Sequence, residues 1–146
     1  MDRTSLTVLS GVVALVMGCS TDLPTPSPND PLIGCWLGED FQPVFQRKAI
    51  WFMHRKADGT FTIEFTTIEQ GATLPIQTEE GLWTHKDGIY ITKTLKISGQ
   101  SLDSKDSHYH DTYEIKAITN GVMTYHHPKM NITFTSKKVA CERSAV

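Results

Sequence analysis

The chain has 146 residues, a formal net charge of −2, and acidic and basic side chains mixed along its length. This length allows one domain with a single core. No basic stripe is present that would neutralise the phosphates of a nucleic acid. We therefore expect one folded domain and exclude nucleic acid from the expected partners.

The N-terminus begins with Arg3 near the free amine and continues with an apolar run over residues 8–17. This run is too short to cross a bilayer and has the length of a signal-peptide core. It ends in the sequence VMGC at residues 16–19, which resembles the lipobox of bacterial lipoproteins. The resemblance implies that residues 1–18 are a signal peptide that is removed. An ordinary signal peptide or an apolar N-terminal strand are the alternatives.

The same resemblance implies that Cys19 becomes a lipidated N-terminus, with a diacylglycerol on its thiol and a third acyl chain, such as palmitate, on its amine. Each buried CH₂ group contributes ~0.8 kcal/mol, so three chains anchor a protein stably in a membrane. Ser20 follows the cysteine, and by resemblance to bacterial sorting this favours the outer membrane. We expect a lipid-anchored protein whose domain lies in the periplasm or at the cell surface.

Residues 19–31 combine this cysteine with a proline-rich stretch that contains four prolines, at positions 24, 26, 28 and 31. Proline removes a backbone donor and favours an extended polyproline path. We expect a tether here, so that the folded domain occupies residues 32–146 and stands off the membrane.

Two cysteines remain if Cys19 carries lipid, namely Cys35 and Cys141. In an exported, oxidising setting an even pair usually forms a disulfide. This bond would join the two ends of the domain and stabilise it by roughly 4–5 kcal/mol. Two unpaired buried thiols are the alternative.

From residue 44 onward, apolar and polar residues alternate in short runs that Asp58-Gly59, Asp87-Gly88 and Asn120-Gly121 separate. Alternation predicts strands, and these dipeptides favour tight hairpins. We expect about eight antiparallel strands in a meander. A meander exposes two edges unless it closes, so a small barrel is the expected fold and a sandwich is the alternative.

Gly34-Cys35-Trp36, near the start of this domain, resembles the Gly-x-Trp motif of lipocalins and related calycins. The resemblance implies a lipocalin-like barrel in which Gly34 and Trp36 belong to the closing end. In that family a basic residue from near the C-terminus packs on the tryptophan. Lys137, Lys138 and Arg143 are the candidates in this chain.

A barrel of this kind binds a small apolar or amphipathic ligand, or is filled by its own side chains. A cavity below roughly 100 Å³ would exclude such a ligand, because binding pockets run to ~300 Å³ or more. The candidate lining residues are Phe52, Phe61, Ile63, Phe65, Tyr109 and Tyr113.

Histidines cluster late in the chain, and a two-residue turn at Asn120-Gly121 would place Glu114 opposite His127. His108, His110, Glu114 and His127 would then share one face and offer ligands that Zn²⁺ accepts. The alternative is a histidine-rich surface without metal, because residues 108 and 114 lie near 20 Å apart along a strand at ~3.3 Å each.

The sequence contains no nucleophile elbow, no zinc-protease motif and no phosphate-binding glycine loop. We therefore expect a protein that is not an enzyme and that needs no cofactor. Ligand binding is the favoured function. The main alternative is a tethered domain that binds or inhibits another protein of the cell envelope.

Overall fold

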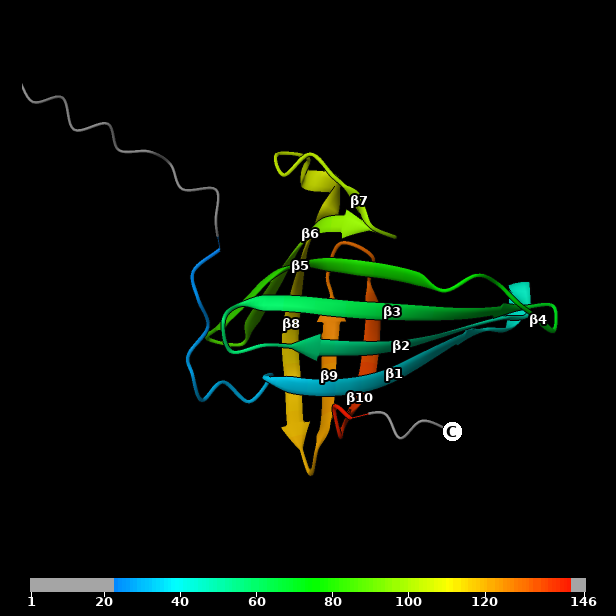
Figure 1. Cartoon of the computed structure of the whole chain (residues 1–146). Helices are drawn as coiled ribbons and strands as arrows, with labels where there is room; N and C mark the ends of the chain where they lie inside the picture. The colour runs from blue at the N-terminus through cyan, green and yellow to red at the C-terminus, as the bar shows by residue number, and fades with distance from the viewer. Residues whose placement is uncertain (1–22, 143–146) are drawn as a thin grey trace, which may run out of the picture.

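Ten strands and two short 3-10 helices follow one another within residues 23–142, the part of the chain that this computed structural model describes (Figure 1). The expected signal peptide and Cys19 lie outside the described residues. No helix within residues 23–142 is long and apolar enough to cross a membrane. The elements are β1 (Gly34–Gln42), η1 (Pro43–Phe45), β2 (Arg47–Arg55), β3 (Thr60–Glu69), β4 (Ala72–Thr73), β5 (Gln77–Lys86), β6 (Ile89–Ile97), β7 (Gln100–Ser101), η2 (Ser107–Tyr109), β8 (His110–Thr119), β9 (Val122–His127) and β10 (Ile132–Val139).

Eight of these strands close into an antiparallel barrel, which confirms the expected fold class. The eight strands pair in chain order, and the last one, β10, pairs with the first, β1. Cys35 lies opposite Val139 in this closing pair, and Gly38 lies opposite Ser136. Closure leaves no free edge in the ring. The two-residue strands β4 and β7 lie outside it, on β3 and β6 respectively.

Two of the expected hairpin turns have left-handed backbone at both central residues. Asp87 and Gly88 have φ angles of 52° and 77°, and Asn120 and Gly121 have φ angles of 51° and 72°. Two successive positive φ angles define a type I′ turn, whose twist matches that of the flanking strands. The local sequence therefore fixes the β5–β6 and β8–β9 hairpins.

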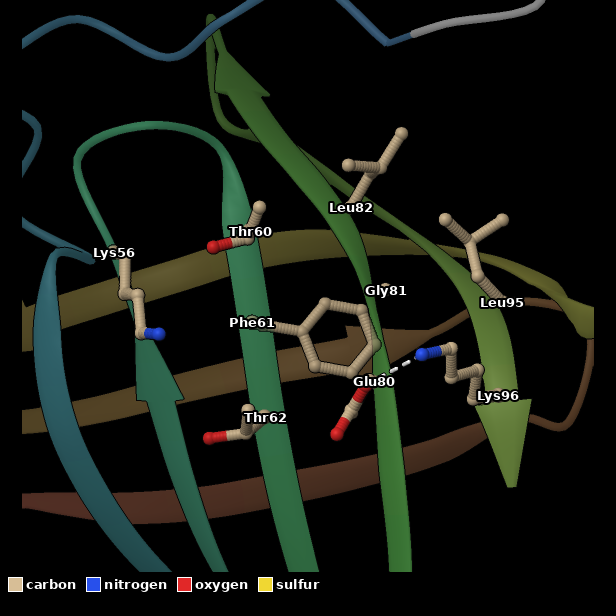
Figure 2. Close-up of a pocket in the computed structure, with 9 residues that line it drawn as sticks. All are labelled: Lys56, Thr60, Phe61, Thr62, Glu80, Gly81, Leu82, Leu95 and Lys96. Carbon is tan, nitrogen blue, oxygen red and sulfur yellow. Dashed lines mark ion pairs between the residues drawn. The ribbon is translucent and has the colours of Figure 1, made fainter. Parts of the chain in front are cut away.

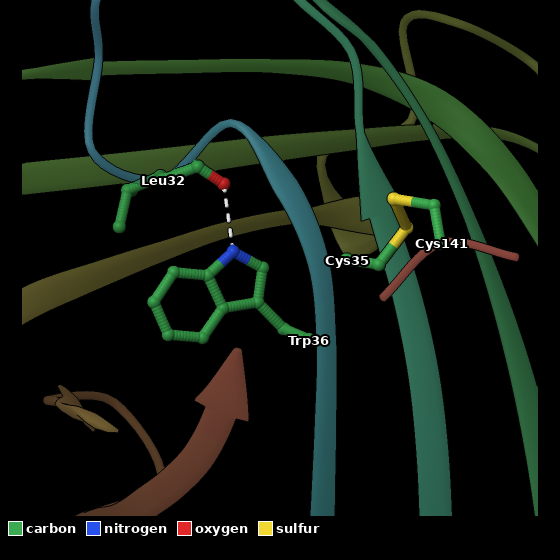
Figure 3. Close-up of a disulfide and its surroundings, with 4 residues drawn as sticks. All are labelled: Leu32, Cys35, Trp36 and Cys141. Carbon is green, nitrogen blue, oxygen red and sulfur yellow. Dashed lines mark hydrogen bonds between the residues drawn. A yellow bond between two sulfur atoms is a disulfide. The ribbon is translucent and has the colours of Figure 1, made fainter. Parts of the chain in front are cut away.

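One end of the barrel is closed by the segment that leads into β1. Leu32 and Trp36 are 0 % and 1 % exposed, and the Trp36 indole N–H donates a hydrogen bond of 2.9 Å to the Leu32 carbonyl (Figure 3). The Lys138 ammonium lies 5.5 Å from the centre of a Trp36 ring. Lys138 thus lies where a basic residue on the tryptophan is expected, and Arg143, another of the candidates, lies outside the described residues.

The expected disulfide joins Cys35 to Cys141 beside this closed end (Figure 3). Their Cα atoms are 5.1 Å apart, although the two residues are separated by 106 positions in the sequence. The bond therefore fastens the start of the barrel to the segment that follows its last strand.

The described part of the expected tether also lies against the barrel (Figure 1). Pro26 is buried and packs closely on Gly59. Asp30 is 9 % exposed, and its carboxylate lies 2.9 Å from the His85 ring nitrogen Nδ1. The second half of the proline-rich stretch is thus fixed to the domain, because its apolar ring and its carboxylate both find partners there.

The opposite end lies where β1, β2 and β3 run past the other strands (Figure 1). The η1 turn and the β4 loop meet there, and the Gln70 N–H donates a hydrogen bond of 3.1 Å to the Gln46 carbonyl. The two ends of the barrel therefore differ: one is plugged by Leu32 and Trp36, and the other carries long loops.

Candidate functional site

The inside of the barrel holds a cavity of about 170 Å³. This volume exceeds the limit of roughly 100 Å³ set above and is smaller than the ~300 Å³ of many ligand pockets. Aromatic and aliphatic side chains form most of the wall, and acids and hydroxyls form the rest. The lining residues are Met53, Phe61, Ile63, Phe65, Glu79, Tyr90, Thr92, Thr94, Asp111, Tyr113 and Tyr125.

The apolar side of this cavity follows from strict alternation along β3. Phe61, Ile63 and Phe65 all line the cavity, and Ile63 lies opposite Met53 of β2. Gly81 of β5 lies opposite Phe61, at a bulge in the pairing of β5 with β6. A Cβ atom on Gly81 would come within 2.8 Å of the Phe61 ring, so the glycine leaves the room that this ring occupies.

Three tyrosine rings form one wall of the cavity. Tyr90 and Tyr113 stack with ring centres 5.3 Å apart, and Tyr113 and Tyr125 meet edge to face at 5.4 Å. Arg55 lies against Tyr90: its Nε donates a hydrogen bond of 2.9 Å to the Tyr90 hydroxyl, and its Cζ lies 4.5 Å from the ring centre. Arg55 itself does not line the cavity.

Burial raises the pKa of Tyr90 to about 12 and also raises the pKa of Tyr113 and Tyr125, in each case because the phenolate would lose its hydration. All three side chains are therefore neutral at physiological pH. They offer the cavity aromatic faces and uncharged hydroxyl groups.

The polar side of the cavity carries two carboxylates. Glu79 accepts hydrogen bonds from the Gln77 amide at 2.9 Å and from the Thr94 hydroxyl at 3.2 Å. Burial is the main cause that raises the pKa of Glu79, and the negative charge of Asp111 adds to it. The charge of Asp111 is therefore felt by Glu79.

Asp111 is held by a histidine from the neighbouring strand. The Met130 backbone N–H donates a hydrogen bond of 3.1 Å to His127 Nδ1, so the ring's proton sits on Nε2. Nε2 then donates to Asp111 Oδ1 over 3.0 Å. This chain of bonds fixes one carboxylate oxygen of Asp111 and leaves the other for a further partner.

Two further recesses lie at the loop-bearing end, and both share Phe65 with the cavity. One recess has a volume of about 250 Å³ and the other about 380 Å³. The first is lined by Asp40, Ala49, Trp51, Ile63, Phe65, Tyr113, Met130 and Phe134, and the second by Arg47, Ala49, Phe65, Thr67, Leu74, Pro75, Gln77 and Glu79. Phe65 therefore borders the inner cavity and both recesses.

Another recess of about 380 Å³ lies on the outer surface of β3, β5 and β6 (Figure 2). Glu80 and Lys96 form an ion pair of 3.7 Å on it, and both side chains are at least half exposed. Figure 2 shows the Phe61 ring beside Gly81 at this recess. Because this recess faces water, its polar groups are hydrated and it gives less basis for a specific site than the interior.

Four of the six expected lining residues line the cavity, namely Phe61, Ile63, Phe65 and Tyr113. Phe52 does not, because its neighbours Trp51 and Met53 point inward and place it on the outer face, opposite Leu37 and Glu64. Residues 50–53 are all apolar, so the sequence pattern does not show which of them face the interior. In the structure the tryptophan, which is larger than Phe52, faces inward.

Tyr109 also does not line the cavity, because it belongs to η2, before β8 begins. The acids and hydroxyls of the site were not among the residues expected from the sequence. One signal was present for Asp111: it lies two residues before Tyr113, so placing Tyr113 inside already placed Asp111 on the same face.

The four expected metal ligands are not brought together. A bulge between Ile115 and Ala117 shifts the pairing, so Glu114 lies opposite His126 rather than His127. The Glu114 side chain is outward and pairs with Lys116. His127 instead points inward, to Asp111.

The two remaining histidines of that set are separated as well. His108 lies in η2 with its ring against Tyr109, whereas His110 is exposed at the start of β8. Within residues 23–142, one group of metal-type ligands lies within 4.8 Å, formed by Cys35, His54 and Cys141. Its two sulfur atoms are joined in the disulfide, so in this state His54 alone retains a free donor.

No protein-family model matches this chain, and none of the curated proteins matches it in sequence. The function has to be inferred from the residues of the barrel.

Proposed function

We propose that this protein binds a small amphipathic ligand inside its barrel, as a binding protein rather than an enzyme. The observation that carries this proposal is the interior cavity of about 170 Å³, with aromatic walls and a polar side. Its continuation past Phe65 into the recess of about 250 Å³ provides an entrance and room for an apolar chain.

Calorimetric titration of the purified chain with straight alkan-1-ols of four to ten carbons tests this proposal. Hexan-1-ol has seven non-hydrogen atoms, and a Kd of about 1 mM needs only about 0.6 kcal/mol from each, well within what small ligands achieve. We expect binding at this level or tighter, with affinity that rises with chain length and then levels off. Absence of binding for the whole series would contradict the proposal.

A cavity-filling variant locates the site. Thr92→Phe adds a ring inside the cavity and should abolish alkanol binding, whereas Thr62→Phe adds the same ring on the exposed face of β3 and should leave it unchanged. Overpacking costs about 1–3 kcal/mol. Phe65→Trp, which narrows the entrance, serves as a second variant if Thr92→Phe does not fold.

In the same proposal the protein is an outer-membrane lipoprotein anchored through Cys19. The sequence at residues 16–19 supports this, and the disulfide suits an exported protein. Because Pro26 packs on Gly59, a spacer between an anchor at Cys19 and the barrel would be shorter than the whole proline-rich stretch. Mass spectrometry of the protein from its host should find an acylated Cys19 at the N-terminus. An unmodified chain that begins at Met1 would contradict the anchor.

A second candidate function, binding of an envelope protein, is favoured by apolar side chains at the loop-bearing end. Val44 is 88 % exposed there, in a loop hydrogen-bonded to the neighbouring one. Large exposed apolar groups of this kind often mark protein contacts. The group consists of Phe41, Val44, Phe45, Leu74 and Ile76.

A photo-crosslinking residue at position 44, expressed in the host, tests this second candidate. It should give one adduct of defined mass, and Phe45→Asp in the same chain should remove that adduct. No adduct in the envelope of the host would argue against a protein partner. Alkanol binding by Phe45→Asp should be unchanged, which separates the two functions.

A further inference from the structure

The cavity that the proposed function uses is acidic. Glu79 and Asp111 both line it, and none of the other lining residues is basic. The two carboxylates lie on β5 and β8, on either side of β6, and the charge of Asp111 raises the pKa of Glu79. The residues that line the cavity therefore carry negative charge and no positive charge.

A threonine beside Asp111 adds a hydrogen-bond acceptor to the cavity. Thr92 of β6 is 7 % exposed and pairs across the sheet with Asp111. Thr92 lines the cavity, whereas the hydroxyl of its neighbour Thr94 donates to Glu79. The oxygen of a threonine hydroxyl has lone pairs that can accept a hydrogen bond from a ligand.

The remaining walls are suited to a cation as well. Tyr90, Tyr113 and Tyr125 turn aromatic rings to the same cavity, and ring centres of neighbours lie 5.3 Å and 5.4 Å apart. The electron-rich face of an aromatic ring attracts an ammonium group, and the attraction is stronger where water is excluded.

Arg55 is a cation close to the cavity, but it does not line the cavity. It is 1 % exposed, it donates to the Tyr90 hydroxyl, and it packs on the Tyr90 ring. Its charge also acts on Tyr113 and Tyr125, and its Nη1 atom has no hydrogen-bond partner in the described chain. An anionic ligand bound to Nη1 is therefore the alternative that an anionic probe tests.

We propose that the ligand is a small amphipathic cation, whose ammonium group lies between Glu79, Thr92 and Asp111 against the tyrosine rings. Its N–H groups donate to the free Asp111 oxygen and to the Thr92 hydroxyl. Its apolar chain runs past Phe65 toward Trp51 and Met130 in the adjoining recess. This inference rests on the proposed function and adds the charge of the ligand to it.

Three probes of equal chain length test the charge: hexylammonium, hexan-1-ol and hexanoate, titrated into the purified full-length chain at pH 7 and low salt. We expect hexylammonium to bind about tenfold more tightly than hexan-1-ol, and hexanoate to bind most weakly. In the double variant Glu79→Gln/Asp111→Asn the ratio of hexylammonium affinity to hexan-1-ol affinity should fall from about tenfold to about one.

Glu80→Gln and Glu114→Gln are matched controls, because each removes an outward carboxylate from the same two strands. Both should retain the tenfold preference.

Equal binding of hexylammonium and hexan-1-ol would overturn the charge inference and leave the proposed function standing. Tightest binding of hexanoate would overturn it in favour of Arg55. A preference that survives in the double variant would overturn the assignment to the two acids, and no binding of any probe would overturn both proposals.

Discussion

Lys138 holds its ammonium group 5.5 Å from the centre of a Trp36 ring, so that the last strand of the barrel covers the first residues of the first strand. The indole N–H of Trp36 donates a hydrogen bond to the Leu32 carbonyl. One aromatic residue thus joins the entry segment, β1 and β10.

Trp36→Phe removes this junction in part. The Leu32 carbonyl loses its buried donor, which costs about 1–3 kcal/mol, and the smaller ring leaves a void. We expect the free energy of unfolding to fall by about 2–4 kcal/mol, measured by urea denaturation. Phe41→Ala, at a side chain that is 60 % exposed, should change it by less than about 0.5 kcal/mol. A similar loss in both variants would mean that the closed end has no special role.

Replacement of both Cys35 and Cys141 by alanine opens a loop of 106 residues. The loop-entropy model gives a loss of about 4–5 kcal/mol, because the unfolded chain regains the freedom that the bond removes. Urea denaturation of the double variant measures this loss. The wild-type protein treated with a thiol reductant should unfold at the same urea concentration as the variant. An unchanged midpoint in both cases would show that the disulfide does not form in solution.

The fold could be predicted because its determinants are local or lie at fixed positions. Asn120-Gly121 favours one turn type regardless of its surroundings, and alternation along β3 fixes which side chains share a face. Two cysteines at the ends of a domain constrain the closing pair directly. These signals act over a few residues or through one covalent bond, and both kinds are visible in a sequence.

The site was harder to predict because it depends on strand phase and register. A change of one residue in phase moves every side chain to the other face of the sheet. Four apolar residues in a row hid the phase of β2, so Phe52 was placed inside and Trp51 was not. A single bulge after Ile115 moved His127 from the expected metal face to the interior. Bulges arise from packing between strands, which no local pattern reports.

The pH dependence of stability in the variant Glu79→Gln tests whether the Glu79 carboxyl group is buried. Burial raises the pKa of Glu79 in the folded protein above its ordinary value of 4.5. Between the unfolded and the folded pKa the folded state binds more protons, so the free energy of unfolding falls as pH rises through this window and stays lower above it. Glutamine cannot ionise and avoids this loss.

The stability of Glu79→Gln relative to the wild type should therefore be higher at pH 7.5 than at pH 3.5, as measured by urea midpoints at both values. Glu80→Gln is the matched control, because it changes an exposed carboxylate on the outer face of the same strand. A relative stability of Glu79→Gln that does not change with pH would mean that the acid is well hydrated in the cavity.

The buried tyrosines predict how the stability of the protein changes at high pH. The pKa of Tyr90 is raised to about 12 by burial, and the pKa of Tyr113 is raised in the same direction, whereas an unfolded tyrosine ionises near pH 10. Above about pH 10 the unfolded state releases phenolic protons that the folded state keeps, so the free energy of unfolding falls as pH rises. Tyr113→Phe removes one of these groups, and its hydroxyl has no hydrogen-bond partner in the described chain. This variant should match the wild type at pH 7 in urea denaturation and lose stability less steeply above pH 10.

The ionisation of the tyrosines can also be followed directly by absorbance at 295 nm. Ionisation of all four tyrosines near pH 10 in the folded protein would contradict the burial of the tyrosine rings.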